Sequence, residues 1–113
     1  MELISVSKEQ DVAVVRPTMK RLDGSVAPAF KGAMQELIGR GEKRLVLDLE
    51  GVDFMDSSGL GAMVSVLKAL GGTGALAVCN VRGGVLSLFK LTRMDKVFAI
   101  ADTREDALRR AAA

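Results

Sequence analysis

The sequence predicts an α/β domain with a mixed sheet of four to five strands, about four helices and the element order ββαβαβαβα. Apolar runs of strand length alternate along the chain with segments whose apolar residues recur at helical spacing. Two strand-like segments at the start are joined by a short polar stretch, which indicates a hairpin. Since the chain has 113 residues and no repeat or linker, we expect a single domain spanning residues 1–113.

A β-hairpin and a helix are the first elements expected along the chain. Residues 2–7 alternate in polarity, residues 11–17 are mostly apolar, and the polar stretch between them favours a turn. Residues 25–39 predict a helix that Ser25 caps and Gly39 ends. The apolar stripe expected on this helix consists of Val26, Ala29, Phe30, Ala33, Met34, Leu37 and Ile38.

A parallel strand–helix–strand unit is the expected centre of the fold. Residues 44–49 (RLVLDL) are almost continuously apolar, which is typical of a central strand covered on both faces. A helix from about Ser57 to Leu70 and a strand at 75–81 follow, and this order predicts two parallel strands. The stripe expected to be buried on this helix consists of Leu60, Met63, Val64, Leu67 and Leu70.

The last third of the sequence predicts two further helices separated by a strand. Residues 83–92 indicate a short helix, residues 96–101 a strand, and residues 103–111 a final helix that begins with a capping box, Thr103 and Asp106. The side chains expected to point inward from the short helix are Val85, Leu88, Phe89 and Leu91. The residues expected in the core are Val26, Phe30, Met34, Leu37, Leu45, Leu47, Leu60, Leu67, Val78 and Phe89.

The composition disfavours several classes of function. The chain has no histidine and one cysteine, so we expect neither a histidine-activated nucleophile nor a zinc site, and Cys79 is expected to be a core residue. The net charge is +2, the basic residues are scattered, and Trp and Tyr are absent, which disfavours nucleic-acid binding. No window approaches the roughly 20 apolar residues of a membrane span, and no signal peptide is recognisable, so we expect a cytoplasmic protein.

The segment FMDSSGLGAM at residues 54–63 places an acid and two hydroxyls between a buried strand and two glycines. Ser57 and Ser58 could form a nucleophile, a helix start or a site of modification. Catalysis is disfavoured because no histidine and no G-x-S-x-G motif are present, and Lys68 would lie about 16 Å along the same helix. Magnesium binding by the flanking carboxylates and phosphate binding by an incomplete G-x-G-x-x-G pattern are weak alternatives.

A helix start is the simplest role for this segment. Asp56 would accept hydrogen bonds from the free amides of the first turn. Gly59 and Gly61, however, each lower helix stability by roughly 1 kcal/mol relative to alanine. Close approach by another molecule, or tight packing on a strand, would account for the two glycines.

The segment LDLEGVDFMDSSGLGAMVSVLKAL strongly resembles the signature of STAS domains, in particular the bacterial anti-sigma factor antagonists. In that family an apolar strand and an acidic loop with an aromatic residue lead to D-S-S-G-L-G at the start of a helix. LAVCNV and LFKLTRMDKVFAI continue the resemblance, and RLD at residues 21–23 is similar to the family's G-E-L-D. The departures from the family pattern are Lys20-Arg21 for Gly-Glu, Gly83-Gly84 for Ser-Pro and Arg93 for a glycine.

The resemblance implies a binding switch rather than an enzyme. Ser57 occupies the position that an anti-sigma factor with serine kinase activity phosphorylates in the family. The unphosphorylated form would bind this kinase and release the sigma factor, and a PP2C-type phosphatase would reverse the modification. The residues expected at the partner-binding surface are Asp23, Asp56, Ser57, Ser58, Gly59, Leu60 and Gly61.

No cofactor, metal ion, nucleic acid or membrane is expected as a partner, and the chain is expected to be a monomer or a weak dimer. An alternative interpretation is a STAS module that serves as a structural or regulatory subunit of another signalling or lipid-transport assembly. A nucleotide-binding or hydrolytic enzyme is the third class. In the first interpretation, phosphate on Ser57 would add a charge of about −1.5 to −2 beside Asp56, at an amide-rich helix start that tolerates an anion.

Overall fold

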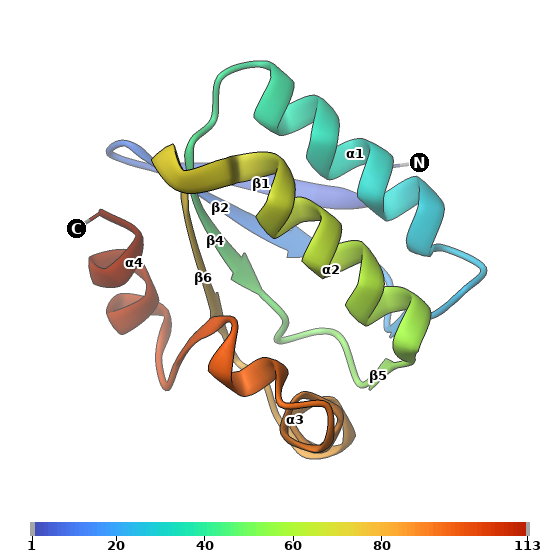
Figure 1. Cartoon of the computed structure of the whole chain (residues 1–113). Helices are drawn as coiled ribbons and strands as arrows, with labels where there is room; N and C mark the ends of the chain where they lie inside the picture. The colour runs from blue at the N-terminus through green and yellow to red at the C-terminus, as the bar shows by residue number, and fades with distance from the viewer. Residues whose placement is uncertain (1, 113) are drawn as a thin grey trace.

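A five-stranded mixed sheet forms the centre of the computed structural model, which describes residues 2–112 (Figure 1). Its strands lie in the order β1-β2-β4-β6-β7. β1 is antiparallel to β2, and the other pairs are parallel, so the expected mixed α/β sheet is confirmed. The strands span Ile4–Glu9 (β1), Val12–Pro17 (β2), Arg44–Asp48 (β4), Ala75–Cys79 (β6) and Ala99–Ala101 (β7).

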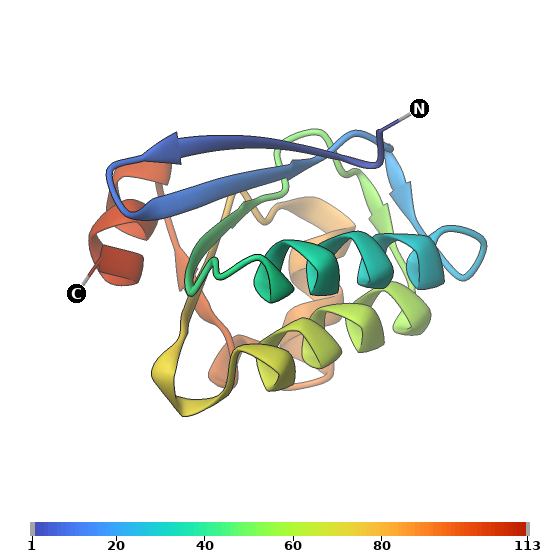
Figure 2. The same cartoon turned by 90° about the horizontal axis from the view of Figure 1, so that it is seen from above.

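Helices cover both faces of this sheet. Helices α1 and α2 lie side by side on one face, and α4 packs on the opposite face (Figures 1 and 2). Within residues 2–112, no helix is long and apolar enough to cross a membrane. The helices span Ala27–Gly39 (α1), Ser57–Leu70 (α2), Gly83–Leu91 (α3) and Arg104–Ala112 (α4), and short 3₁₀ turns follow at Gly71–Thr73 and Met94–Lys96.

The hairpin and the central strand follow the expectations from the sequence. Glu9 pairs with Val12, so Gln10 and Asp11 form a two-residue turn in which Gln10 has a φ of +57°, as hairpin turns require. Strand β4 is central, and its alternate residues face different cores. Leu45 and Leu47 belong to the core beneath α1 and α2, and Val46 belongs to the core beneath α4.

The buried side of α2 is wider than the sequence predicted. Of the ten residues expected in the core of the whole domain, eight are buried. The other two, Val26 and Leu67, are half-buried and pack against the core. Helix α2 contacts α1 as well as the sheet. Ala62 and Val66 are therefore buried, and Val64 and Leu67 lie at the edge of the core.

The C-terminal end of α3 corrects one expectation. Leu91 was expected to point inward, but 83% of its surface is exposed. The fully buried contacts of α3 come from Val85 and Phe89, which are four residues apart on one side of the helix. Leu91 lies two residues after Phe89, about 200° around the helix axis, and therefore faces away from the core. Arg93, at the family's glycine position, has a left-handed φ of +63°.

Candidate functional site

Two very short strands bring the expected site residues together. β3 (Arg21–Leu22) and β5 (Phe54–Met55) form a separate parallel pair in which Leu22 is opposite Met55. Both of these side chains are buried. The pair places the loop after β3 beside the start of α2. The sequence pattern did not predict these strands, because each one contributes a single buried apolar residue in a polar loop.

Asp56 connects the two segments of the site through both oxygens of its carboxylate. Its Oδ1 accepts a hydrogen bond from the backbone amide of Gly59 at 3.0 Å, which caps α2 as expected. Its Oδ2 accepts a hydrogen bond from the amide of Gly24 at 3.2 Å, across 32 residues of sequence. One side chain therefore fixes the start of α2 to the loop after β3.

Asp23 organises the loop that leads into α1. Its Oδ1 accepts hydrogen bonds from the Ser25 hydroxyl at 2.6 Å and from the Ser25 amide at 3.0 Å. These bonds, with the hydroxyl as the larger cause, hold the pKa of the Asp23 carboxyl below its ordinary value. The expectation that Ser25 caps α1 is wrong. Val26 is the N-cap residue, and its apolar side chain cannot make a capping bond, while the Ser25 hydroxyl donates to Asp23 instead.

Ser57 and Ser58 are the first two residues of α2, and both are exposed. Ser58 faces the loop after β3, since a Cβ placed on Gly24 would lie 3.4 Å from Ser58 Oγ. Ser57 stands next to Asp56 at the first helical position. The free amides and the dipole of a helix start favour a negatively charged group at this position.

The two glycines of the motif have different surroundings. Gly59 is buried, and a Cβ at this position would lie 2.1 Å from the carbonyl oxygen of Leu22 and 3.0 Å from Met55 Cγ. A Cβ on Gly61 would meet nothing within 4 Å, and Gly61 is exposed. Tight packing on a strand therefore explains Gly59, whereas the fold itself does not require a glycine at position 61.

An open groove of about 300 Å³ continues the site between α1 and α2. Leu60 does not belong to it, because its side chain is buried in the core beneath the helix. Of the residues expected at a partner surface, the side chains of Asp23, Asp56, Ser57 and Ser58 remain at least partly exposed. The groove is lined by Gly24, Ala27, Pro28, Lys31, Ser58, Gly61, Ala62 and Ser65.

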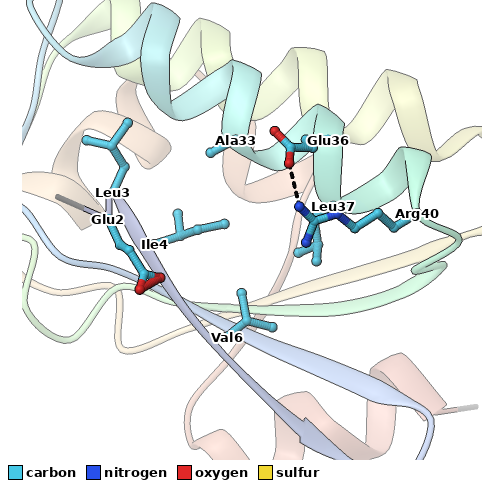
Figure 3. Close-up of a pocket in the computed structure, with 8 residues that line it drawn as sticks. All are labelled: Glu2, Leu3, Ile4, Val6, Ala33, Glu36, Leu37 and Arg40. Carbon is cyan, nitrogen blue, oxygen red and sulfur yellow. Dashed lines mark hydrogen bonds and ion pairs between the residues drawn. The ribbon is translucent and has the colours of Figure 1, made fainter.

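A second open pocket, of about 240 Å³, lies between β1 and α1 (Figure 3). Most of its lining side chains are apolar, and of its three charged residues, Glu2, Glu36 and Arg40, the last two pair with each other. It shares no lining residue with the groove beside Ser58.

The carboxylates and Cys79 are the remaining side chains with metal-binding or nucleophilic chemistry. Within residues 2–112, no group of three or more Cys, Asp or Glu side chains is placed to hold a metal ion. Cys79 is buried at the end of β6, and burial, assisted by the Asp48 carboxylate, raises the pKa of its thiol to about 11. A neutral buried thiol is a poor nucleophile, in agreement with a role in the core.

Comparisons with known proteins extend the resemblance to nearly the whole chain. Residues 4–107 match the family model described as STAS domain. An anti-sigma F factor antagonist of Paenibacillus polymyxa is 32% identical over 107 residues, covering 93% of this chain and 91% of that protein.

Solved structures with the same fold agree with this assignment. An anti-sigma factor antagonist from Mycobacterium paratuberculosis has a TM-score of 0.89 at 27% identity, covering 97% of this chain and 93% of its own. An anti-sigma-factor antagonist (STAS) domain protein from Planctomyces limnophilus has a TM-score of 0.81 at 30% identity, covering 97% and 98%. The chain therefore belongs to the STAS domain family, within the group that contains the anti-sigma factor antagonists.

Proposed function

We propose that this chain is an anti-sigma factor antagonist whose binding to its partner is controlled by phosphorylation of Ser57. The unphosphorylated form binds an anti-sigma factor that is also a serine kinase, and this binding releases the sigma factor. The kinase then phosphorylates Ser57, the complex dissociates, and a PP2C-type phosphatase restores the binding form. The chain acts in the cytoplasm, without a cofactor and without catalysing a reaction itself.

The observation that carries this proposal is the position of Ser57. Its side chain is exposed at the first position of α2, in a segment that Asp56 ties to the neighbouring loop. A kinase can reach such a hydroxyl without unfolding any element. Because the helix start offers free amides to an anion, the folded chain also tolerates the product.

Electrostatics explain how the modification would prevent binding. Ser57 is adjacent to Asp56 in sequence, and Asp23 is part of the loop that Asp56 holds through Gly24. A phosphate adds a charge of about −1.5 to −2 to this acidic surface. A partner that fits the neutral hydroxyl then meets both added bulk and added negative charge. We expect the binding free energy to weaken by at least roughly 1–3 kcal/mol, the range of typical regulatory couplings.

The proposed partner surface divides the motif into contact residues and supporting residues. Asp23, Ser57, Ser58 and Gly61 present exposed or partly exposed atoms to a partner. Gly59 and Leu60 are buried and act by shaping the helix start. Because Gly61 has no side chain, the partner can approach the backbone of α2 closely beside the groove.

The test compares binding of the purified anti-sigma factor to four forms of the chain: wild type, Ser57→Ala, Ser57→Asp and the phosphorylated protein. Wild type and Ser57→Ala should bind, whereas Ser57→Asp and the phosphorylated protein should bind poorly. Ser58→Ala is the matched control, since it should still accept phosphate at Ser57. Circular dichroism should show the same helix content in all forms. Equal affinity in all four would remove Ser57 from the mechanism and favour a structural subunit of another assembly.

A further inference from the structure

An arginine stacked on an exposed phenylalanine lies directly beside the Ser57 segment. The Arg21 guanidinium carbon is 3.9 Å from the centre of the Phe54 ring, and the two residues are register partners in the β3–β5 pair. Phe54 is one of four large apolar side chains exposed in the described residues, at 37%. The Arg21 side chain is 61% exposed. Both strands continue directly into site residues, β3 into Asp23 and β5 into Asp56.

The orientation of Arg21 is held from two directions. The Phe54 ring supports one face of the guanidinium, and Arg21 Nε lies 3.6 Å from Asp23 Oδ2. Within residues 2–112, the ion pair with Asp23 is the one in which Arg21 takes part. Since the contact with Asp23 is made by the Nε side, the terminal amino groups remain available to solvent or to a partner. A side chain restrained in this way loses less conformational freedom when it binds.

The chemistry of this pair fits a carboxylate on a protein partner. A planar guanidinium presents parallel N–H donors that match the two oxygens of a carboxylate. Arginine and aromatic residues are also the side chains that dominate the energetics of protein interfaces. A partner that covers the pair would remove the exposed Phe54 ring from water, which a phosphate on Ser57 would not do. The charge around the pair is mixed, because Lys20 and Asp23 flank β3 in sequence and Asp53 and Asp56 flank β5.

We propose that Arg21, held in place by Phe54, is a specificity contact that receives an Asp or Glu side chain of the partner. This inference rests on the proposed function, because it assigns part of the same partner surface. It applies to this chain in particular, since Lys20-Arg21 stands where the family pattern has Gly-Glu. The partner of this chain must therefore carry a negative group opposite β3.

The experiment measures the affinity of the unphosphorylated chain for the purified anti-sigma factor by calorimetry. Arg21→Glu should weaken binding roughly 10- to 100-fold, because it replaces attraction by repulsion at a restrained contact. Arg21→Lys keeps the charge but loses the planar fork and should weaken binding about 3- to 10-fold. Arg109→Glu is the matched control: Arg109 is also an exposed arginine paired with a nearby aspartate, but it lies on α4. Thermal unfolding checks that each variant is folded.

The role of Phe54 is measured with a double-mutant cycle. If Phe54 acts by holding Arg21, Phe54→Leu weakens binding in the wild-type background and has little further effect in the Arg21→Lys background. Substituting the partner's acidic residues one at a time by arginine should identify one that restores binding to Arg21→Glu. Absence of such a residue would overturn the carboxylate assignment.

Two results separate this inference from the proposed function. If Arg21→Glu binds as tightly as Arg109→Glu while Ser57→Asp binds poorly, the Arg21 contact is overturned and the switch stands. If Arg21→Glu binds poorly while Ser57→Asp binds like wild type, the contact stands and the switch is overturned. If Arg21→Gln changes the pKa of phosphoserine 57 in ³¹P NMR but leaves the affinity of the unphosphorylated chain unchanged, Arg21 serves the phosphate and the proposal fails.

Discussion

The first turns of α2 carry one glycine on the inner side, which faces the fold, and one on the outer side, which faces solvent, and the two positions differ in why glycine is present. On the inner side, Gly59 packs so tightly on β3 that a methyl group would lie 2.1 Å from the Leu22 carbonyl oxygen. On the outer side, Gly61 borders an open groove, and a methyl group would meet nothing within 4 Å. Two glycines in one motif therefore have separate causes. The fold requires the first, and only a partner can require the second.

Gly59→Ala should have the largest effect on stability. Because the new Cβ would overlap a backbone oxygen, no change of side-chain rotamer can relieve the clash, and β3 must move away from the start of α2. We expect the free energy of unfolding to fall by at least about 3 kcal/mol. Urea denaturation checks this. A wild-type midpoint for Gly59→Ala would show that the inner side is not as tightly packed as described.

Asp56→Ala should have the next largest effect, because it removes the acceptor for both Gly59 and Gly24. We expect a loss of about 1–2 kcal/mol from the cap and the connecting bond together. Asp56→Asn should lose less, since its single amide oxygen can still cap the helix. Thermal unfolding of both variants measures the difference. Equal losses would mean that the cap contributes nothing, whereas no loss in Asp56→Asn would mean that the bond to Gly24 contributes nothing.

Gly61→Ala should move stability and binding in opposite directions. The fold has room for the methyl group, so alanine should raise the free energy of unfolding by up to about 1 kcal/mol through its helix propensity. The same methyl group would stand on the proposed partner surface and should weaken binding of the anti-sigma factor. Denaturation and calorimetry on one preparation give both values. A variant that is more stable and binds normally would place Gly61 outside the interface.

Cys79→Ala should have the smallest effect at neutral pH, because Cys79 lies in the sheet and not at the start of α2. Burial raises the pKa of the thiol from 9.0 to about 11, so the unfolded chain loses this proton first as the pH rises. The thiol contribution is therefore complete below about pH 9 and is lost on approaching pH 11. The stability difference between wild type and Cys79→Ala should shrink over this range. Partner binding at neutral pH should not change.

The main elements of the fold were predictable because their signals are periodic and long. The helix at Ser57–Leu70 and the central strand at Arg44–Asp48 each repeat one pattern over several residues, and a single ambiguous residue does not obscure it. The Asp106 amide donates a hydrogen bond to the Thr103 hydroxyl at 3.1 Å, as expected for the start of the last helix. These elements could be predicted from the local sequence alone.

The rest depended on contacts between segments that are distant in sequence. β3 and β5 are two residues long and exist because Leu22 and Met55 are buried together, which no local pattern reports. Ser25 had the correct residue type for a cap, but competition from Asp23 decided its hydrogen bonds. For the motif itself, the sequence indicated the cap by Asp56, but not that its second oxygen holds Gly24.

The two hydrogen bonds of Asp56 also bear on how this site can change during evolution. Gly24 contributes only a backbone amide to its bond, so another small residue could replace it, although proline, which has no N–H, could not. Position 56 is far more restricted, since asparagine offers one acceptor oxygen where aspartate offers two, and glutamate is longer. In descendants of this chain the acid should therefore persist while the residue that it holds drifts. The size of the side chain should limit variation at position 24, because Ser58 Oγ lies close by.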